Sequence, residues 1–300
     1  MNGLRILAPA STANLGPAFD CLGLALDLWN ETQIAISEES QIDIQGEGSD
    51  ELPRDESNLV IRAARAVYQH LGEPPPAGWH LRAHNRIALG SGLGSSASAT
   101  ASGLLAANRL TGVQLALGEL LHIGATIEGH ADNLAAALYG GLVLVNQIHG
   151  KWLAQPVDIP PLSCVVALPD INISTQQARA ALPAQVALAE AVANIGHSLA
   201  VLEALRAGDI AALANAVQDR LHQPYRLALI PGAEEALRAA QAAGGAAALS
   251  GAGPSLIAFV EEGREKAVSE ALRAPFAERG VSVRHYRLMT TAKAAAVSED

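Results

Sequence analysis

The chain has 300 residues, of which half are apolar and only 3% aromatic, and its formal net charge at pH 7 is −10. This length predicts one large domain or two medium ones with an aliphatic core, and the negative charge argues against a nucleic-acid or anionic membrane partner. Gly, Asn, Arg or Pro interrupts each apolar run before the roughly 18 residues of a membrane span and no signal-peptide pattern is present, so we expect a soluble, cytoplasmic protein.

The N-terminal part of the chain is predicted to form two strands, over residues 4–8 and 31–37. Small, polar and turn-forming residues dominate the segment between them, from Pro9 to Asp27. Loops of this kind on a rigid scaffold often hold binding groups. An irregular capped turn without a binding role is the simpler interpretation of the composition alone.

A predicted helix and a predicted strand follow this loop. Asn58 is expected to cap a helix over residues 59–71, whose apolar residues recur at helical spacing. Residues 79–89 are expected to form a weak strand that leads into a glycine-rich turn.

That turn, which we call the glycine loop, has three glycines at alternate positions before a predicted helix over residues 97–110. Glycine lets the backbone approach a ligand closely, and Ser95 or Ser96 is expected to cap the helix, whose free amides suit a phosphate. The loop lacks the lysine of a Walker loop and departs from the dinucleotide fingerprint at Ser95. A flexible turn before a buried helix remains the alternative. The glycine loop consists of Ala88, Leu89, Gly90, Ser91, Gly92, Leu93, Gly94, Ser95, Ser96, Ala97 and Ser98.

A second helix is predicted over residues 115–128, with Leu121 and Glu128 on one face. A carboxylate on a core-facing stripe is costly without a partner, so either a cation lies beside Glu128 or the helix ends before it. Asp132 or Asn133 is then expected to cap a helix through Leu138, which ends at a pair of glycines before a strand over residues 142–146.

A change in composition over residues 151–161 predicts a domain boundary, and we place the two domains at residues 1–155 and 156–300. The second domain is predicted to begin with a buried strand over residues 163–168.

Ser174 opens a capping box before the helix that carries Arg179. A second interior arginine, Arg226, lies between two later helices, although a lone arginine is normally a solvated surface charge. The remaining predicted elements are helices over 184–206, 209–222 and 233–243, a hairpin over 249–259, a helix near 263–279 and a strand near 281–289.

Several of these segments resemble the motifs of the GHMP kinases, a superfamily that includes galactokinase, homoserine kinase and mevalonate kinase. Residues 90–97 resemble its second motif. Residues 249–259 resemble its third, whose glycine loop packs against the nucleotide and phosphate site. The Pro9–Asp27 segment and the sequences around Arg179 and Arg226 resemble those of homoserine kinases. Three departures are Ala88 where proline is usual, Ala18 where glycine is usual, and Glu128 only two residues before His130.

The resemblance implies an α+β fold with two domains, an N-terminal ribosomal-protein-S5-like α/β domain and a C-terminal ferredoxin-like α+β domain. The implied activity is the ATP-dependent phosphorylation of L-homoserine to O-phospho-L-homoserine, a step of threonine biosynthesis, with ATP and Mg²⁺ as cofactors. A homodimer is compatible with the family, although the sequence identifies no interface for it. Another GHMP-type small-molecule kinase, a non-catalytic nucleotide-binding relative and a purely structural glycine-turn protein remain alternatives.

The resemblance also implies a role for each site residue. Asp20 would pair with the substrate ammonium, and two arginines would bind its carboxylate, a task for which planar forks of donors are well shaped. Whether Asp132 accepts a proton stays open, and we expect no dedicated base because phosphoryl transfer depends mostly on positioning. The nucleotide would be bound by residues 88–98, Asn58, Gly251 and Gly253; Mg²⁺ by Ser96 and Glu128; the substrate by Asn14, Asp20, His130, Thr175, Arg179 and Arg226; and Asp132, Asn133 and Arg179 would be catalytic.

Overall fold

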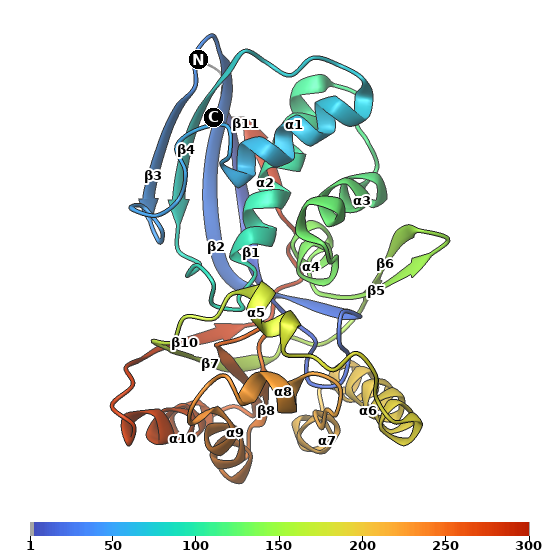
Figure 1. The fold of residues 1–300 in the computed structure, drawn as a ribbon, viewed down its shortest axis with the longest axis vertical. Helices are drawn as coiled ribbons and strands as arrows, with labels where there is room; N and C mark the ends of the chain where they lie inside the picture. Colours follow the sequence, from blue (N-terminus) through green and yellow to red (C-terminus); the bar gives the residue numbers. More distant parts are fainter. Residues whose placement is uncertain (1–2, 300) are drawn as a thin grey trace.

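The computed structural model describes residues 3–299, which form two halves, each built on its own β-sheet (Figure 1). The upper half in Figure 1 contains a seven-stranded sheet with the order β11-β1-β2-β4-β3, to which β5 and β6 are added beside the start of β2. Its strands are β1 (Leu4–Ala13), β2 (Leu22–Ser37), β3 (Gln41–Gly46), β4 (Gly78–Asn85), β5 (Leu142–Ile148), β6 (Lys151–Val157) and β11 (Ala296–Glu299).

Four helices cover one face of this sheet (Figure 1). They are α1 (Leu59–Leu71), α2 (Ser95–Thr111), α3 (Leu117–Glu128) and α4 (Asp132–Tyr139). β3 and β4 run parallel, as the crossover through α1 requires. Apolar side chains from the sheet, such as Ile34 and Leu81, pack against helix residues such as Ile61 and Leu104 to form the first core.

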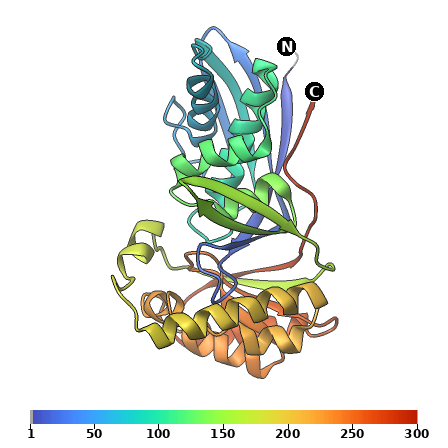
Figure 2. The same ribbon diagram turned by 90° about the vertical axis from the view of Figure 1, so that its right-hand side faces the viewer.

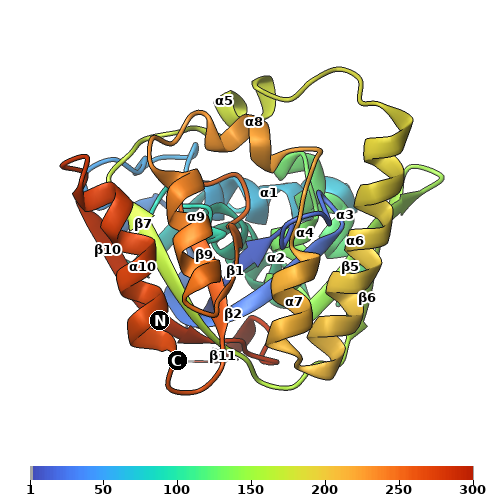
Figure 3. The same cartoon turned by 90° about the horizontal axis from the view of Figure 1, so that it is seen from below.

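The lower half is built on a four-stranded antiparallel sheet with the order β10-β7-β9-β8. Its strands are β7 (Ser163–Pro169), β8 (Ala246–Leu249), β9 (Leu256–Val260) and β10 (Val283–Met289). Alternate residues of a strand point to opposite faces. Val165 therefore packs toward α9 (Ala233–Ala242) and α10 (Glu265–Ala277). Val166 packs toward the opposite face, in the core that contains the start of β2 and the pair α6 (Leu188–Ala207) and α7 (Ile210–Ala216); Figure 3 shows the two helix pairs side by side.

Two short helices lie where the halves meet, α5 (Thr175–Ala180) and α8 (Gln223–Leu227) (Figure 1). The shared core beneath them includes Leu22, Leu24 and Leu26 of β2 together with Phe259 of β9. The first strands of the chain thus reach into the second half, and both halves contribute residues to the junction.

The predicted two-domain α+β fold is confirmed by this architecture. The helix over 59–71, with Asn58 as its cap, and the capping box of Ser174 and Gln177 are also observed. The division at residue 155 stays a prediction. β6 continues to Val157, and the C-terminal β11 pairs with β1 in the first sheet.

Several local predictions were wrong. The segment over residues 9–27 is mostly strand, because β1 runs to Ala13 and β2 begins at Leu22, so the loop between them is short. The helix predicted over 209–222 ends at Ala216, and α8 and β11 were not predicted. Gly94, with a φ of 70°, takes the cap position expected for Ser95 or Ser96, and Ala131 takes the one expected for Asp132 or Asn133.

One helix among residues 3–299, α6, is long and apolar enough to cross a membrane by length and composition alone. Polar residues such as Glu190, Asn194 and Glu203 interrupt its apolar sequence, and a single helix of this kind is weak evidence for a membrane span. α6 lies along the surface of the lower half (Figure 2) and exposes Leu188, Val192, Ile195 and Leu199. Its opposite face carries the buried Asn194, which donates a hydrogen bond to the Pro17 carbonyl. α6 is therefore attached to the rest of the chain by specific polar contacts.

Candidate active site

A cavity of about 350 Å³ lies between the two halves. Apolar residues and asparagines of the first half line one end, the glycine loop lines the middle, and charged residues line the other end. The apolar end includes Ile44, Leu52, Leu59, Val60, Ala83 and Leu89 together with Asn58 and Asn85. The charged end includes Asn14, Asp20, His130, Asp132, Asn133, Thr175, Arg179, Arg226 and Gly251.

The glycine loop adopts a backbone that only glycine accommodates at two of its positions. Gly92 and Gly94 have φ angles of 79° and 70°, in the left-handed region. A Cβ on Gly92 would lie 2.2 Å from the Ser250 carbonyl oxygen, and one on Gly94 would lie 2.1 Å from Ser11 Oγ. The loop is therefore packed closely against β1 and against the turn after β8.

Hydrogen bonds fix this loop from both halves of the molecule. The Ser91 hydroxyl donates to the Ala88 carbonyl (2.7 Å) and accepts from Leu93 N (3.2 Å). Ser11 N donates to the Leu93 carbonyl (3.0 Å), and Ser250 Oγ donates to the Gly92 carbonyl (2.8 Å). The carbonyls of Ala88, Gly92 and Leu93 are thus all hydrogen-bonded, which holds the loop in this conformation.

The glycine loop opens directly into α2. The first intrahelical hydrogen bond runs from Ser98 N to the Gly94 carbonyl (2.9 Å), so the amides of residues 95–97 have no partner within the helix. The first turn of α2 contains no acidic residue. These amides, at the positive end of the helix dipole, form a site suited to a phosphate group.

Glu128 is the last residue of α3, beside this site, so the alternative that the helix ends before it is wrong. A cation beside Glu128 stays a prediction. The Glu128 carboxylate accepts two hydrogen bonds from hydroxyls of α2: Ser96 Oγ donates to one oxygen (2.8 Å) and Thr100 Oγ1 to the other. Residues 3–299 contain no group of three or more His, Cys, Asp or Glu side chains that could hold a metal. One carboxylate and one hydroxyl fit Mg²⁺, which takes most of its ligands from water and phosphates.

His130, Asp132 and Asn133 form a hydrogen-bonded group near the glycine loop. Asp132 Oδ1 lies 3.0 Å from His130 Nδ1 and accepts from Asn133 N (2.7 Å). Asn133 Oδ1 accepts from the Ser11 hydroxyl (2.9 Å). Burial alone would lower the pKa of His130, but the hydrogen bond and charge of Asp132, with the charge of Glu128, outweigh it and the pKa is raised.

The loop between β1 and β2, residues 14–21, is the substrate loop of the family resemblance. Asn14 Oδ1 accepts from Asp20 N (2.9 Å), and Asn14 Nδ2 donates to the Gly251 carbonyl (2.9 Å). Asp20 accepts two hydrogen bonds from Arg179 of α5, at 2.9 and 3.0 Å. Burial would lower the pKa of Arg179, but the hydrogen bonds that Arg179 donates to Asp20, together with the charge of Asp20, outweigh burial and raise this pKa. The carboxylate and the guanidinium expected to bind opposite ends of a zwitterion are thus already paired.

Arg226 of α8 is buried, contrary to the usual position of a lone arginine. Its Nη1 donates to the Gly251 carbonyl (3.1 Å) and its Nε to the Ala178 carbonyl (3.3 Å). The guanidinium carbons of Arg226 and Arg179 lie 5.0 and 5.6 Å from the ring centre of Phe19. Burial and the neighbouring charge of Arg179 lower the pKa of Arg226. Two cations therefore meet at one aromatic ring at the charged end of the cavity.

Most of the predicted site residues line the cavity, including Gly90, Ser95, Thr175, Gly251 and Gly253. The side chains of Ala88, Leu93, Ala97 and Ser98 are fully buried and do not line it, so these four can contribute only backbone atoms. Asn58 both caps α1 and lines the cavity, so its two interpretations are compatible.

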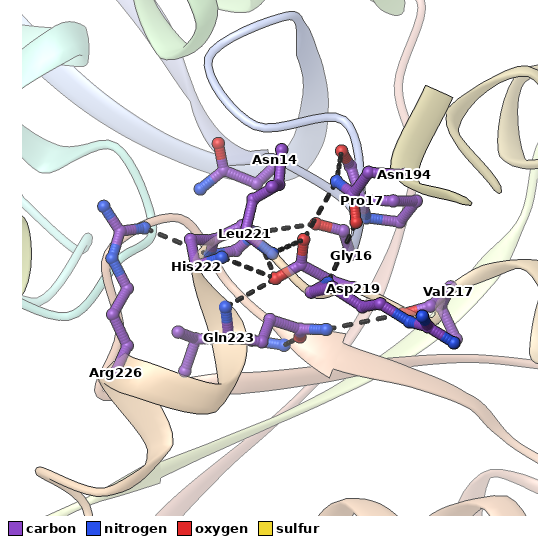
Figure 4. Close-up of polar contacts among 12 residues, drawn as sticks. Asn14, Gly16, Pro17, Asn194, Val217, Asp219, Leu221, His222, Gln223 and Arg226 are labelled. Atoms are coloured by element: carbon purple, nitrogen blue, oxygen red, sulfur yellow. Dashed lines mark hydrogen bonds and ion pairs between the residues drawn. The ribbon is translucent and has the colours of Figure 1, made fainter. Parts of the chain in front are cut away.

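Sequence reasoning missed two parts of the site. The apolar end draws residues from β3, β4 and α1, and no local motif marks such a set. The second part is a buried polar cluster around Asp219 and His222, next to Arg226 (Figure 4). Its only sequence signal is that His222 lies one turn before Arg226.

Comparisons with known proteins agree with this geometry. Residues 58–141 match the family profile described as GHMP kinases N terminal domain, and residues 201–278 match GHMP kinases C terminal. Homoserine kinase of Moorella thermoacetica is 44% identical over 92% of this chain and 93% of its own length. Homoserine kinase of Trichormus variabilis is 39% identical, with 94% of each chain covered.

Solved structures of kinases have a similar fold. Homoserine kinase from Cytophaga hutchinsonii has a TM-score of 0.87 and 30% identity, with 99% of this chain and 98% of that chain covered. Mevalonate kinase of L. major shares the fold at a TM-score of 0.73 and 20% identity, with 96% of each chain covered. The fold and these similarities define a small-molecule kinase. The chain belongs to the GHMP kinase family, among the homoserine kinases.

Proposed function

We propose that this protein transfers the γ-phosphoryl group of ATP to the hydroxyl of L-homoserine, forming O-phospho-L-homoserine for threonine biosynthesis in the cytoplasm. The observation that carries the proposal is the charged end of the cavity, where Asp20, Arg179 and Arg226 gather around Phe19. A free amino acid presents one ammonium and one carboxylate, which this set of charges matches. An uncharged sugar presents no charged group for these residues to bind.

The nucleotide is assigned to the other two parts of the cavity. The apolar end accommodates the base, and the free amides of residues 95–97 bind the phosphates. Ser96 and Glu128 are the residues that would hold Mg²⁺, which supplies neutralisation of the phosphate charge. The hydroxyls of Ser91 and Ser250 donate hydrogen bonds to carbonyls of the glycine loop. These bonds hold the loop in the conformation that leads into the free amides.

The amino acid is assigned to the charged end. Asp20 binds the ammonium, and Arg179 and Arg226 bind the carboxylate, in charge-assisted hydrogen bonds. The hydroxyl then points toward the glycine loop, and His130, Asn133 and Thr175 also line the charged end of the cavity. The ion pair between Asp20 and Arg179 holds the two side chains beside each other at this end of the cavity.

Catalysis in this proposal depends on positioning without a dedicated base. The Asp132 carboxylate already faces His130 and accepts from Asn133 N, so its role is to hold these two residues. In-line placement of a hydroxyl against the γ-phosphorus can supply most of the required acceleration.

The test is an ADP-release assay with L-homoserine, mevalonate and galactose side by side at saturating ATP and Mg²⁺. We expect turnover with homoserine alone. Turnover with mevalonate or galactose instead would assign the protein to another GHMP-type activity, and ATP binding without acceptor-dependent ADP release would indicate a non-catalytic relative. A homodimer stays a prediction, which the molecular mass in solution would check.

A further inference from the structure

A polar cluster is buried behind Arg226, where the segment after α7 meets the substrate loop (Figure 4). The side chains of Asp219 and His222 are fully buried in it. Neither residue lines the cavity, so neither touches the proposed substrate. Buried polar groups of this kind are costly unless their hydrogen bonds are satisfied, and the partners of this cluster indicate what it does.

The two ring nitrogens of His222 face opposite kinds of partner. Nε2 lies 2.6 Å from the Gly16 carbonyl oxygen and 3.5 Å from Asp219 Oδ2, which are both acceptors. Nδ1 lies 3.4 Å from Arg226 Nη1, and a guanidinium can only donate. The proton of the neutral ring is therefore on Nε2, and Nδ1 accepts from Arg226.

The surroundings of His222 favour this neutral form. Burial, the largest cause, and the charge of Arg226 lower the pKa of His222, while Asp219, Asp20 and the Gly16 carbonyl act in the opposite direction. The net pKa is lowered, so the ring stays neutral and keeps a lone pair toward Arg226 at physiological pH.

Asp219 anchors the segment that carries His222. Its two carboxylate oxygens accept hydrogen bonds from the backbone amides of residues 221–223, at 2.5–3.0 Å. It also accepts from Asn194 Nδ2 of α6 (3.1 Å), which donates in addition to the Pro17 carbonyl (2.7 Å). α6, the start of α8 and the substrate loop are thus joined in one network.

Phe19 provides a second route between His222 and the arginine. The rings of Phe19 and His222 are stacked, with their centres 5.1 Å apart and their planes at 27°. The guanidinium of Arg226 lies over the same Phe19 ring. A shift of the imidazole would therefore move both the aromatic surface and the hydrogen-bond acceptor of Arg226.

We propose that His222 is a positioning residue for the carboxylate-binding arginine: Nδ1 accepts from Arg226 and orients its guanidinium, while Nε2 holds the Gly16 carbonyl of the substrate loop. Three partners from three segments, the carbonyls of Ala178 and Gly251 and the ring of His222, fix the guanidinium plane. This inference rests on the proposed function, because it takes Arg226 as the group that recognises the substrate carboxylate. If His222 orients Arg226, it contributes to the preference of the enzyme for acceptor substrates that have a carboxylate over those that lack one.

Two substitutions separate the roles of the two ring nitrogens. In His222→Gln the amide nitrogen reaches the place of Nε2 and still donates to Gly16, but nothing accepts from Arg226. In His222→Asn the amide lies near the place of Nδ1, so an acceptor for Arg226 is kept while Gly16 loses its donor. His70→Gln is the matched control, since His70 is exposed in the last turn of α1, far from the cavity lining.

Each variant is assayed with L-homoserine and with 2-amino-1,4-butanediol, which has the same ammonium and hydroxyl but no carboxylate. In His222→Gln the KM for homoserine should rise about tenfold, as for loss of one hydrogen bond to a charged group. The kcat/KM for the aminodiol and the KM for ATP should stay at the values of the unsubstituted enzyme. His222→Asn should lower the melting temperature and keep more of the preference for homoserine than His222→Gln does.

Equal losses for homoserine and the aminodiol in His222→Gln would overturn the proposal, since a purely structural role affects both acceptors alike. ¹⁵N NMR of the unsubstituted protein gives a readout that requires no variant to fold. A neutral ring protonated on Nε2 is expected, and a ring protonated on Nδ1 would overturn the contact with Arg226. If the unsubstituted protein did not phosphorylate homoserine, the proposed function would fail, and the NMR result would still decide whether His222 accepts from Arg226.

Discussion

Replacing either arginine at the charged end with alanine should weaken homoserine binding, but only one replacement should reduce stability. Arg179 is 37% exposed and makes its ion pair with Asp20 at the edge of the cavity. Arg226 is 2% exposed and donates to the carbonyls of Ala178 and Gly251, with its guanidinium over the Phe19 ring. The two residues therefore share a proposed ligand but differ in what they support in the unbound protein.

The expected magnitudes follow from these contacts. A hydrogen-bonded charge pair with the substrate is worth about 1.5–3 kcal/mol, so either Arg179→Ala or Arg226→Ala should raise the homoserine KM by about one to two orders of magnitude. Arg179→Ala removes the partly exposed ion pair between Arg179 and Asp20, which should change the free energy of unfolding by only about 0–1 kcal/mol. Arg226→Ala deletes a large buried side chain and should cost about 2–3 kcal/mol, which lowers the melting temperature by about 5–10 °C.

The assay titrates L-homoserine at saturating ATP and Mg²⁺ with detection of ADP, and thermal unfolding is followed on the same samples. Arg206→Ala, at a largely exposed position on α6, is the control and should change neither quantity. An unchanged homoserine KM in either variant would remove that arginine from the site. Equal melting temperatures for Arg179→Ala and Arg226→Ala would refute the inference that the buried arginine contributes more to stability. This conclusion would hold whatever the kinetic constants of the two variants are.

Three further predictions concern the rest of the site. Glu128→Gln keeps the size of the side chain but loses its charge, so kcat should fall by about two orders of magnitude and more Mg²⁺ should be needed; a Mg²⁺ titration like that of the unsubstituted enzyme would contradict the assignment. Gly94→Ala introduces a Cβ at a φ of 70° and 2.1 Å from Ser11 Oγ, which should cost at least about 1–2 kcal/mol and raise the KM for ATP, and an unchanged melting temperature would show that this close contact is absent. Because Asp132 raises the pKa of His130 in the folded state, protonated His130 contributes stability that is fully present below its unfolded pKa and is lost as pH rises through the folded value. Asp132→Asn should lower the His130 pKa in an NMR titration and remove this pH dependence, whereas an unchanged titration would show that Asp132 is not the partner.

Local chemistry made some elements predictable. Asn58 marks the start of α1 because its side chain accepts from Val60 N, and Ser174 with Gln177 forms the reciprocal capping pair before α5. These signals depend on residues within one turn of each other, so the sequence contains all of the information. The cap expected at Ser95 or Ser96 was wrong because the left-handed conformation of Gly94 ends the loop first.

Elements that depend on distant partners could not be predicted. Leu4 of β1 pairs with Glu299 of β11, at the other end of the chain, and nothing local in residues 296–299 indicates a strand. Asp219 and His222 look from sequence like residues of a helix over 209–222. Only the contact between His222 and Gly16, 206 residues apart in the chain, places them behind the substrate loop.

The site residues that belong to recognisable sequence motifs could be predicted. The family resemblance placed the glycine loop, Asp20 and both arginines, and the structure brings all of them to one cavity. It did not indicate that Arg179 and Asp20 are bonded to each other in the unbound protein. The apolar end and the His222 cluster consist of residue types that occur throughout any core, so their roles depend on the fold.

The distribution of cations in the cavity explains how two anions could bind in an acidic protein without competing for one site. None of the three lysines lines the cavity, and both arginines that line it lie at the end away from the apolar pocket. A lysine at the glycine loop would attract the carboxylate of an amino acid as well as a phosphate. Helix amides act only within the first turn and favour a multiply charged phosphate, whereas a pair of guanidiniums favours a planar carboxylate. In the proposed complex, this separation admits homoserine in a single orientation, with its carboxylate at Arg226 and its hydroxyl toward the γ-phosphate.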